Sequence, residues 1–344
     1  VAKQPGKPIL HVTTKASDAP VIIEADGHAS STNHLHSYEL DEVFDETSDT
    51  ATVYDATARP LVQTVLDGMN ATLMCYGMTG SGKTHTMLGD RAVEGIVGHA
   101  ARQLLQAAQE SGGAVTVGVS FMQLYGTVAS DLLCSAGAPL KVTRRDGEVV
   151  VEGQSVRAVS TPADVEAVVA EGVKRRKVCS QNLNSASSRS HAVLTFHVST
   201  TTVTPTTTTS EADEEEGEAK GESMGADGGS GPDGGTVLAR CAKLSCVDLA
   251  GCERVKESGV SGVALREAQA INLSLFHLVR VVQALNANAT SATSAKKRPE
   301  RVPYADSPLT TLLSDALGGN CRTALIATLS PAQRHAAQTA VSCA

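Results

Sequence analysis

The sequence lacks three features that would place it in a special class of protein. It has no apolar run near the roughly 18 uninterrupted residues of a membrane span. Its start lacks the order of a signal peptide, a basic segment followed by an apolar one. Its eight cysteines include no C-x-x-C pair, so neither a zinc site nor a disulfide framework is indicated. We therefore expect a cytosolic chain with reduced thiols and no membrane partner.

Negative charge is in excess overall, but the excess lies in one segment. The net charge is −8, and residues 200–235 hold nine acidic residues and one lysine. Outside them, 28 of the 37 acidic and 28 of the 29 basic residues remain, so the rest of the chain is neutral. The segment is Thr-rich, then acidic, then Gly-rich, and we expect a disordered insert between two strands because it cannot bury a core. The charge therefore says little about what the folded surface binds, and we expect no nucleic-acid partner.

With 344 residues, 41% of them hydrophobic, the chain has enough material for an α/β domain. Its most informative stretch is ATLMCYGMTGSGKTHTMLG, residues 71–89. Residues 77–84 match G-x-x-x-x-G-K-S/T, the phosphate-binding loop. An apolar run precedes the loop and a segment able to start a helix follows it, the order that the motif requires. A chance Gly-rich turn is the alternative interpretation, and the complete motif with these flanks disfavours it.

The residue types of this loop suit a polyphosphate. Gly77, Gly80 and Gly82 allow backbone conformations that point N–H groups inward, so the ligand meets amides and a helix N-terminus. Lys83 would lie between the β- and γ-phosphates, and the Thr84 hydroxyl would be a Mg²⁺ ligand. The motif thus predicts a nucleotide with its metal ion, but not what the nucleotide is used for.

Periodicity predicts helices that alternate with strands along the chain. The expected helices span 58–67, 95–109, 163–177, 263–285 and 307–317, and one more begins within 331–344. The expected strands span 9–13, 21–24, 71–76, 115–124, 149–156, 193–198, 242–247 and 323–329. The basic run KRRK at 174–177 is expected to be a solvated last helical turn. Helices alternating with strands after a phosphate loop indicate an α/β fold with a central sheet.

Two later segments carry further polar chemistry. Residues 184–191 read NSASSRSH, and residues 248–254 read DLAGCER directly after an apolar strand. Asp248, at a strand end, can hold Mg²⁺ through water, and Gly251 can offer its N–H to a γ-phosphate that is present only before hydrolysis. The first segment supplies hydroxyls for the metal and an arginine that could pair with an acid such as Glu253. Together the two segments predict a sensor of the γ-phosphate.

Six segments match one known family in order and in spacing, from about residue 38 to residue 331. They are YGMTGSGKTHTM (76–87), NSASSRSH (184–191), DLAGCER (248–254), INLSL (271–275), VPYADSPLT (302–310) and LGGNCRT (317–323). By these motifs the chain resembles the kinesin motor domain. The resemblance implies one domain over 1–344, a P-loop NTPase of the α/β class with a mixed, mainly parallel eight-stranded sheet and three helices on each face. It also implies an ATPase coupled to microtubule binding, with ATP or ADP and Mg²⁺ as cofactors.

The resemblance also implies a role for each matching site residue. The nucleotide would be bound by Gly77, Met78, Thr79, Gly80, Ser81, Gly82, Lys83, Thr84, His85 and Thr86, with His85 stacked on the adenine. The metal shell would consist of Thr84 and Ser188, with Asp248 acting through water. The catalytic set would be Lys83, Asn184, Ser187, Ser188, Arg189, Gly251 and Glu253. Within it, Asn184 and Ser187 would line the γ-phosphate and the attacking water, and Arg189 with Glu253 would form a gate that closes on ATP.

The chain departs from the family pattern most on the side that would face the microtubule. Three positions that are basic in the family are Ala305, Pro308 and Thr311 here, and a lysine of the family is replaced by Leu273. Because tubulin is acidic, these changes should weaken the grip on the track. Other basic residues are candidates to compensate: Lys141, Arg144, Arg145, Lys256, Arg266, Lys296, Lys297, Arg298 and Arg301. For Arg157 and Arg280, a solvated surface charge is the expectation.

Two functions stay open from the sequence. The first is an ATP-driven microtubule motor head, and the second is a structural or regulatory microtubule-binding module that hydrolyses ATP slowly and does not step. A small GTPase is disfavoured because the guanine-reading N-K-x-D motif is absent. We expect a cytoplasmic, cytoskeletal location, with a ciliary or flagellar axoneme suggested by the LMCYG run at 73–77. Any dimerisation would use segments outside this chain.

Overall fold

The computed structural model describes residues 9–13, 23–25, 35–90, 92–134, 139–145, 147–178, 189–204, 236–253, 263–291 and 299–330. The described strands form two sheets. The small sheet has the order β2-β1-β3, built from β1 (Ile9–Thr13), β2 (Ile23–Ala25) and β3 (Leu35–Glu39). Both strands predicted near the N-terminus lie in this sheet, the second shifted by one or two residues.

The large sheet has the order β12-β4-β11-β10-β5-β6-β7-β8, with β9 paired to β5. Its strands are β4 (Asn70–Tyr76), β5 (Val115–Tyr125), β6 (Val128–Asp131), β7 (Pro139–Arg145), β8 (Glu148–Glu152), β9 (Arg157–Val159), β10 (His191–Thr204), β11 (Thr236–Asp248) and β12 (Cys321–Ala327). β4 pairs in parallel with β11 and β12, which places the carboxyl ends of all three strands at one edge.

The predicted α/β fold with a mixed sheet is confirmed, but the expected strand directions and strand number need correction. The described part of the large sheet has nine strands rather than eight, and its pairs other than those of β4 are antiparallel. Two of these pairs are hairpins, with tight turns at Gly126 and Gly147, both at positive φ. A two-residue turn can join only antiparallel neighbours, whereas a parallel pair needs a long crossover.

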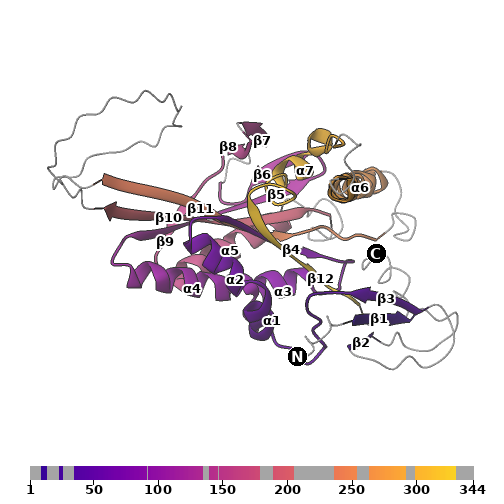
Figure 1. Cartoon of the computed structure of the whole chain (residues 1–344), viewed down its shortest axis with the longest axis horizontal. Helices are drawn as coiled ribbons and strands as arrows, with labels where there is room; N and C mark the ends of the chain where they lie inside the picture. The colour runs from indigo at the N-terminus through magenta and orange to yellow at the C-terminus, as the bar shows by residue number, and fades with distance from the viewer. Residues whose placement is uncertain are drawn as a thin grey trace, which may run out of the picture.

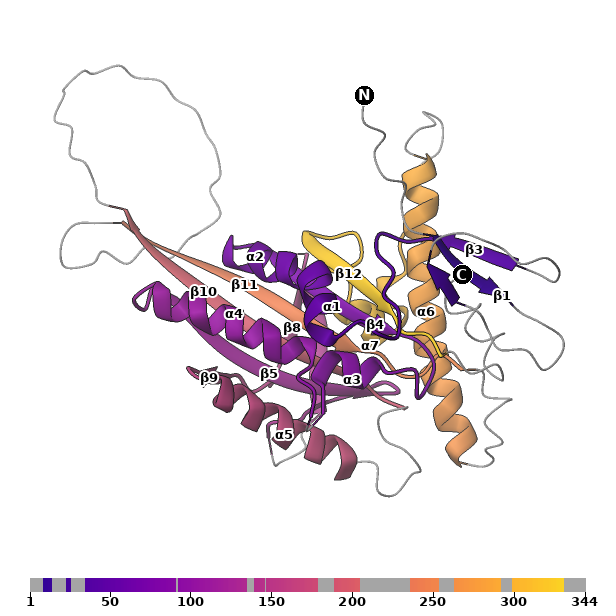
Figure 2. The ribbon, with the colours of Figure 1, turned by 90° about the horizontal axis from the view of Figure 1, so that it is seen from below.

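The helices cover both faces of the large sheet, as Figures 1 and 2 show. One face carries α1 (Thr50–Thr57), α2 (Arg59–Leu66), α3 (Lys83–Leu88), α4 (Ile96–Glu110) and α5 (Pro162–Val178). The other carries α6 (Val263–Ser291), α7 (Pro308–Leu312) and the short 3-10 helix η2 (Tyr304–Asp306). The described helices thus do not divide into the expected three on each face. Residues 331–344, where a last helix was expected to begin, lie outside the described residues.

The central strand β5 is buried on both faces. Phe121 belongs to the apolar core beneath α1 to α5, while its neighbour Met122 belongs to the core shared with Leu309 of α7. Successive side chains of a strand point to opposite faces of the sheet, so a strand between two cores carries apolar residues on both faces. The sequence of β5 is accordingly rich in apolar residues on both faces, with Ser120 and Gln123 as buried polar exceptions, and the strand was predicted correctly.

Some boundaries differ from the predictions for local reasons. The helix predicted from residue 58 is preceded by α1, which is capped by Asp49, whose carboxylate accepts the Thr52 N–H at 2.7 Å. The insert expected from residue 200 begins later, since β10 continues to Thr204, opposite Thr236 of β11. Four strands were missed: β3, β6, β7 and β9. Among the described helices, none is long and apolar enough to cross a membrane.

Candidate nucleotide-binding site

The predicted phosphate loop lies between β4 and α3, at the carboxyl edge of the sheet. Gly77, Gly80 and Gly82 all have positive φ, at 154°, 80° and 105°. A Cβ on Gly77 would lie 2.3 Å from the carbonyl oxygen of Thr328, so this position must be glycine. A Cβ on Gly80 or Gly82 would meet nothing within 4 Å. The loop therefore packs against the end of β12 on one side and faces open space on the other, as a phosphate cradle requires.

Lys83 places a buried positive charge within this loop. Its Nζ donates to the carbonyl oxygens of Gly77 at 2.8 Å and Met78 at 2.7 Å, and the residue is 6% exposed. Burial lowers the pKa of Lys83, and the nearby carboxylates of Asp248 and Glu253 oppose that shift. The predicted phosphate-binding lysine is thus held at the loop by backbone contacts.

Thr84 and Asp248, the two residues predicted to serve the metal, are in direct contact. The Thr84 hydroxyl donates to Asp248 Oδ2 at 2.8 Å, because β11 lies beside β4 and both strands end at the same edge. The other carboxylate oxygen, Oδ1, is buried and has no hydrogen-bond partner among the described residues. A buried carboxylate oxygen without a partner is costly unless a water or a cation meets it. The residues present therefore fit Mg²⁺ at Thr84 with Asp248 behind it.

Arg176 of α5 completes this cluster, and the prediction of a solvated turn at 174–177 was wrong for it. Its Nη1 donates to Asp248 Oδ2 at 2.8 Å and its Nη2 to the Ser190 carbonyl at 2.7 Å. Both side chains of the Arg176–Asp248 pair are under 5% exposed. The missed signal is spacing: Arg176 lies eleven residues, about three turns, after the buried Val165 and so falls on the inward face of the helix.

The second predicted motif docks onto the phosphate loop. Glu253 Oε2 accepts the Thr79 N–H at 2.9 Å, and Oε1 accepts the Thr79 hydroxyl. The Cys252 N–H donates to the Gly77 carbonyl at 3.3 Å. A Cβ on Gly251 would lie 2.3 Å from the Thr79 hydroxyl oxygen and from Glu253 Oε2, so a larger residue would displace this contact. Two segments more than 170 residues apart in the sequence are thus in contact, as the γ-phosphate sensor predicts.

The remaining predicted residues are placed less fully. Asn184, Ser187 and Ser188 lie outside the described residues. Arg189 is half-buried just before β10, and its pairing with Glu253 stays a prediction. His85 is half-exposed and lies 3.6 Å from Asp90, so its face is accessible to an adenine, although that contact is untested. The remaining loop residues hold the loop itself: Ser81 Oγ donates to the Met78 carbonyl, and the Thr86 N–H donates to the Gly82 carbonyl.

A model of the kinesin motor domain matches residues 11–344. The chain belongs to the kinesin motor domain family. It is 36% identical over 309 residues to the kinesin-like protein KIN-UC of Arabidopsis thaliana, covering 88% of this chain and 27% of the relative. It is 34% identical over 298 residues to the mouse kinesin-like protein KIF18A, covering 86% of this chain and 30% of the relative. The chain therefore spans about a third or less of these relatives.

Two solved structures of kinesins share the fold. A fast kinesin superposes with a TM-score of 0.71 at 30% identity, covering 98% of this chain and 84% of that one. A KIF14 dimer with AMP-PNP, in complex with a microtubule, superposes with a TM-score of 0.74 at 28% identity, covering 97% and 86%. These superpositions confirm the predicted kinesin-like fold.

The three basic residues of β7 that were predicted to face the track in this kinesin motor domain are exposed but locally paired. Lys141 Nζ lies 3.8 Å from a carboxylate oxygen of Glu152, and Arg145 also pairs with Glu152. Arg144 donates to the Gly147 carbonyl at 3.0 Å and lies over the Tyr304 ring. Lys256, Lys296, Lys297 and Arg298 lie outside the described residues, and only the backbone of Arg266 is described. Arg301 is exposed. Their contact with a microtubule stays a prediction.

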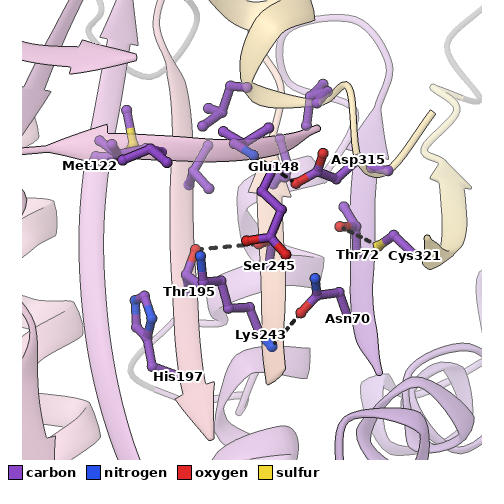
Figure 3. Close-up of a pocket in the computed structure, with 18 of the residues that line it drawn as sticks. Asn70, Thr72, Met122, Glu148, Thr195, His197, Lys243, Ser245, Asp315 and Cys321 are labelled. Carbon is purple, nitrogen blue, oxygen red and sulfur yellow. Dashed lines mark hydrogen bonds between the residues drawn. The ribbon is translucent and has the colours of Figure 1, made fainter. Parts of the chain in front are cut away.

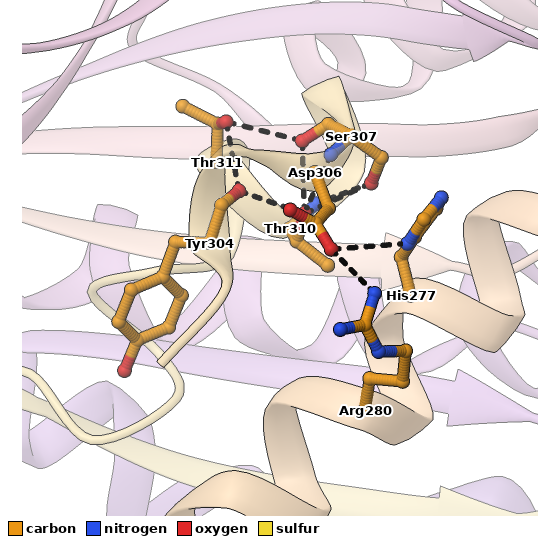
Figure 4. A network of polar contacts seen from close by, with 7 residues as sticks. All are labelled: His277, Arg280, Tyr304, Asp306, Ser307, Thr310 and Thr311. Atoms are coloured by element: carbon orange, nitrogen blue, oxygen red, sulfur yellow. Dashed lines mark hydrogen bonds and ion pairs between the residues drawn. The ribbon is translucent and has the colours of Figure 1, made fainter. Parts of the chain in front are cut away.

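Among the side chains of α6 that the structure describes, the one basic residue, Arg280, is paired. Arg280 donates to Asp306 Oδ2 at 2.7 Å, and His277 Nδ1 lies 3.5 Å from the same oxygen (Figure 4). The solvated charge expected at Arg280 is thus an ion pair that joins α6 to η2, and the one expected at Arg157 is an ion pair with Glu171 of α5. Beside it, Leu273 and Phe276 are 53% and 57% exposed. This part of α6 therefore presents apolar side chains and a neutralised arginine.

A separate cavity of about 280 Å³ lies on the α6 and α7 side of the sheet (Figure 3). Its wall includes Thr72 of β4, Thr195 of β10 and Lys243 of β11, and Asp315 closes it from beyond α7. It also includes Asn70, at the opposite end of β4 from the phosphate loop. None of the predicted nucleotide-binding residues lines this cavity, so it is distinct from the candidate site.

Proposed function

We propose that this domain hydrolyses ATP and couples the turnover to microtubule binding and movement. The observation that carries the proposal is the contact between Thr84 and Asp248, with a buried carboxylate oxygen left free beside it. Lys83 lies on the phosphate loop beside this contact, and Glu253 of the second motif is bonded to Thr79 of the same loop. Phosphoryl transfer requires a cation, a metal-ligating hydroxyl and a second polar motif that reaches the γ-phosphate. Lys83, Thr84 and Glu253 would supply these parts.

Each residue of the site would act by position and charge. Lys83 would neutralise the β- and γ-phosphates, and the Gly251 N–H would donate to the γ-phosphate. Glu253 would pair with Arg189 and accept a proton relayed from the attacking water. Thr84 and Ser188 would hold Mg²⁺, with Asp248 behind them, and the ion when bound supplies charge neutralisation to the phosphates. Asn184 and Ser187 would orient the attacking water.

The proposed partner is the microtubule. The KIF14 relative was solved on a microtubule, and kinesin-like names recur among the relatives. A cytoskeletal location follows from this proposal. An axonemal location and dimerisation through segments outside this chain stay predictions.

A second candidate is a microtubule-binding module that hydrolyses ATP slowly and does not step. The substituted positions Leu273, Ala305, Pro308 and Thr311 favour it, together with the ion pair that neutralises Arg280. A weaker electrostatic grip would lower the rate of encounter with an acidic track and the time spent on it. The two candidates share the nucleotide site and differ in whether the track accelerates turnover.

The test is steady-state ATP turnover of the domain with and without taxol-stabilised microtubules, at low and at physiological salt. Strong stimulation that fades with salt supports the motor. Turnover that microtubules leave unchanged supports the non-stepping module. If the wild-type domain turns over ATP no faster than the Lys83→Ala variant, both candidates are contradicted.

A further inference from the structure

His191 stands where three parts of the molecule meet. It is the first residue of β10, directly after the segment that contains Arg189 and Ser190. Its Nδ1 accepts the backbone N–H of Ala250 at 3.0 Å, and its Nε2 lies 2.9 Å from the hydroxyl oxygen of Ser274 on α6. His191 and Ser274 are 1% and 4% exposed. A buried imidazole with a hydrogen bond at each ring nitrogen thus joins both γ-phosphate segments to the long helix α6.

The donors and acceptors of this connection have a fixed direction. A backbone N–H can only donate, so Nδ1 of His191 must carry the lone pair that receives the bond from Ala250. The hydrogen of a neutral ring is then on Nε2, which donates to Ser274 Oγ. Burial, with help from the positive charge of Arg176, lowers the pKa of His191 to about 3 and so keeps the ring in this neutral form. The chain of bonds therefore runs from amide to ring to hydroxyl.

The two ends of this series of hydrogen bonds lie in the two parts that a motor must connect, the nucleotide site and the long helix α6. Ala250 precedes Gly251, which packs against Thr79 and Glu253 at the phosphate loop. Ser274 follows Leu273, which is exposed on the outer surface of α6. A rigid planar ring leaves little slack between two hydrogen-bond partners. A shift of the Ala250 amide must therefore move the ring and Ser274 with it, or break one of the bonds.

We propose that His191 is a positioning residue that links the γ-phosphate segment to α6 through Ser274, and that microtubule stimulation of ATP turnover depends on this link. The inference rests on the proposed function, since it needs a turnover that microtubules stimulate. His191 acts through the backbone of Ala250 and the side chain of Ser274, while the phosphate loop performs the chemistry.

Matched variants separate the two bonds. Ser274→Ala removes the acceptor on α6 and leaves the phosphate loop unchanged, whereas Ser274→Thr keeps the hydroxyl. His191→Asn keeps an acceptor oxygen near the position of Nδ1 for the Ala250 amide but is too short to reach Ser274. Ser274→Ala and His191→Asn should therefore share one defect. Gln283→Ala, an exposed position of the same helix, is the control for substitution on α6.

The experiment measures ATP turnover against microtubule concentration for the wild-type domain, the four single variants and the Ser274→Ala, His191→Asn double variant. We expect Ser274→Ala to keep its basal turnover and to lose about 5-fold or more of the maximal stimulation, the lower range of a typical coupling between sites. The half-saturating microtubule concentration should change less than the maximal rate. Ser274→Thr and Gln283→Ala should be stimulated like the wild type, and the double variant should be no worse than the worse single variant.

The outcomes separate this inference from the proposed function. If the wild type is stimulated and Ser274→Ala is stimulated equally, the link is overturned while the motor stands. The link is also overturned if the losses of stimulation add up in the double variant and Ser274→Thr loses as much stimulation as Ser274→Ala. His191 and Ser274 would then contribute only through independent packing. An unstimulated wild type would overturn the coupled motor and the link together.

Discussion

The nucleotide edge of the sheet and the α6–α7 face hold their charged groups in opposite ways. At the nucleotide edge, Arg176 and Asp248 are both under 5% exposed and come from segments 72 residues apart. At the other face, Lys141 is 68% exposed and pairs with Glu152 on the adjoining strand of one hairpin. A buried charge must keep its partner, whereas an exposed pair contributes little and is screened by salt. The buried pair holds the candidate catalytic groups in one geometry, whereas the exposed pair can exchange its carboxylate for that of a binding partner.

The largest effect is expected at the nucleotide edge itself. Lys83→Ala removes the cation that would stabilise the phosphates, and ATP turnover should fall by about 100-fold or more. Folding should be retained, because Lys83 contacts only loop carbonyls among the bonds described for it. Turnover and thermal unfolding of the same preparation check both parts. Near-normal turnover in a folded Lys83→Ala protein would contradict the assigned role.

The next largest effect is a loss of stability. Arg176→Ala leaves Asp248 buried without its cation, and the free energy of unfolding should fall by about 3–5 kcal/mol. Arg175→Ala is the matched control, since Arg175 is 30% exposed and pairs with Glu171 on the surface of the same helix. The control should lose about 1 kcal/mol or less. Equal losses in urea unfolding would remove the contrast between buried and exposed pairs.

Stability should also fall in acid because of two buried histidines. Burial lowers the pKa of His191 to about 3, and burial together with Lys243 lowers the pKa of His197 to about 4, from an ordinary value of 6.5. Between pH 6.5 and 4 the unfolded chain therefore binds protons that the native state cannot, so stability declines as the pH falls. Each histidine contributes about 1.4 kcal/mol per pH unit in this window.

His197→Gln isolates one of these contributions. Its Nε2 bonds to the Ser120 hydroxyl at 2.8 Å, and the side-chain amide of glutamine can make a similar bond without titrating. The stability of this variant between pH 6.5 and 4 should depend less on pH than that of the wild type. Urea unfolding at several pH values gives the slopes, and parallel slopes would refute the assignment.

The smallest effect is expected on the α6–α7 face. Glu152→Gln frees Lys141 and Arg145, and microtubule binding should tighten by about 2- to 3-fold at low salt and return to the wild-type value at high salt. Glu148→Gln removes the same charge from the same strand and serves as the control. Cosedimentation at two salt concentrations measures both. The same gain in both variants would mean that net charge, and not the release of the two basic side chains, sets the affinity.

The geometry of the candidate nucleotide site follows from the sequence where its demands are local. The phosphate loop needs glycine at Gly77 for a backbone reason, and the motif records that need directly. The contact of Thr84 with Asp248 follows once β4, which precedes the phosphate loop, and β11, which ends at Asp248, are known to be a parallel pair with their carboxyl ends at one edge. In these cases a short pattern of residue types and the strand order determine the geometry.

The sequence was a poor guide where a side chain pairs with a residue that is distant in the sequence and belongs to no recognisable motif. Arg176 was read with its basic neighbours as solvated, since nothing in 174–177 shows that Asp248 lies opposite. The mainly parallel sheet was an implication of the family resemblance, and the antiparallel pairing of β10 with β5 and β11 left no local signal in the sequence. Strands β6 and β7 were missed because they are short and polar. The pairing of Arg280 with Asp306 was equally hidden, because a surface arginine and an aspartate 26 residues later carry no local signal.

The most direct measurement is the affinity of the domain for microtubules in ADP and in a non-hydrolysable ATP analogue. Coupling between two binding sites is reciprocal, so a nucleotide site that responds to the track must change the affinity for the track. We predict dissociation constants that differ by about 5-fold or more between the two nucleotides, with the difference reduced in Ser274→Ala. Equal dissociation constants in the wild type would show a nucleotide site and a track-binding face that act independently, and would contradict the coupled motor.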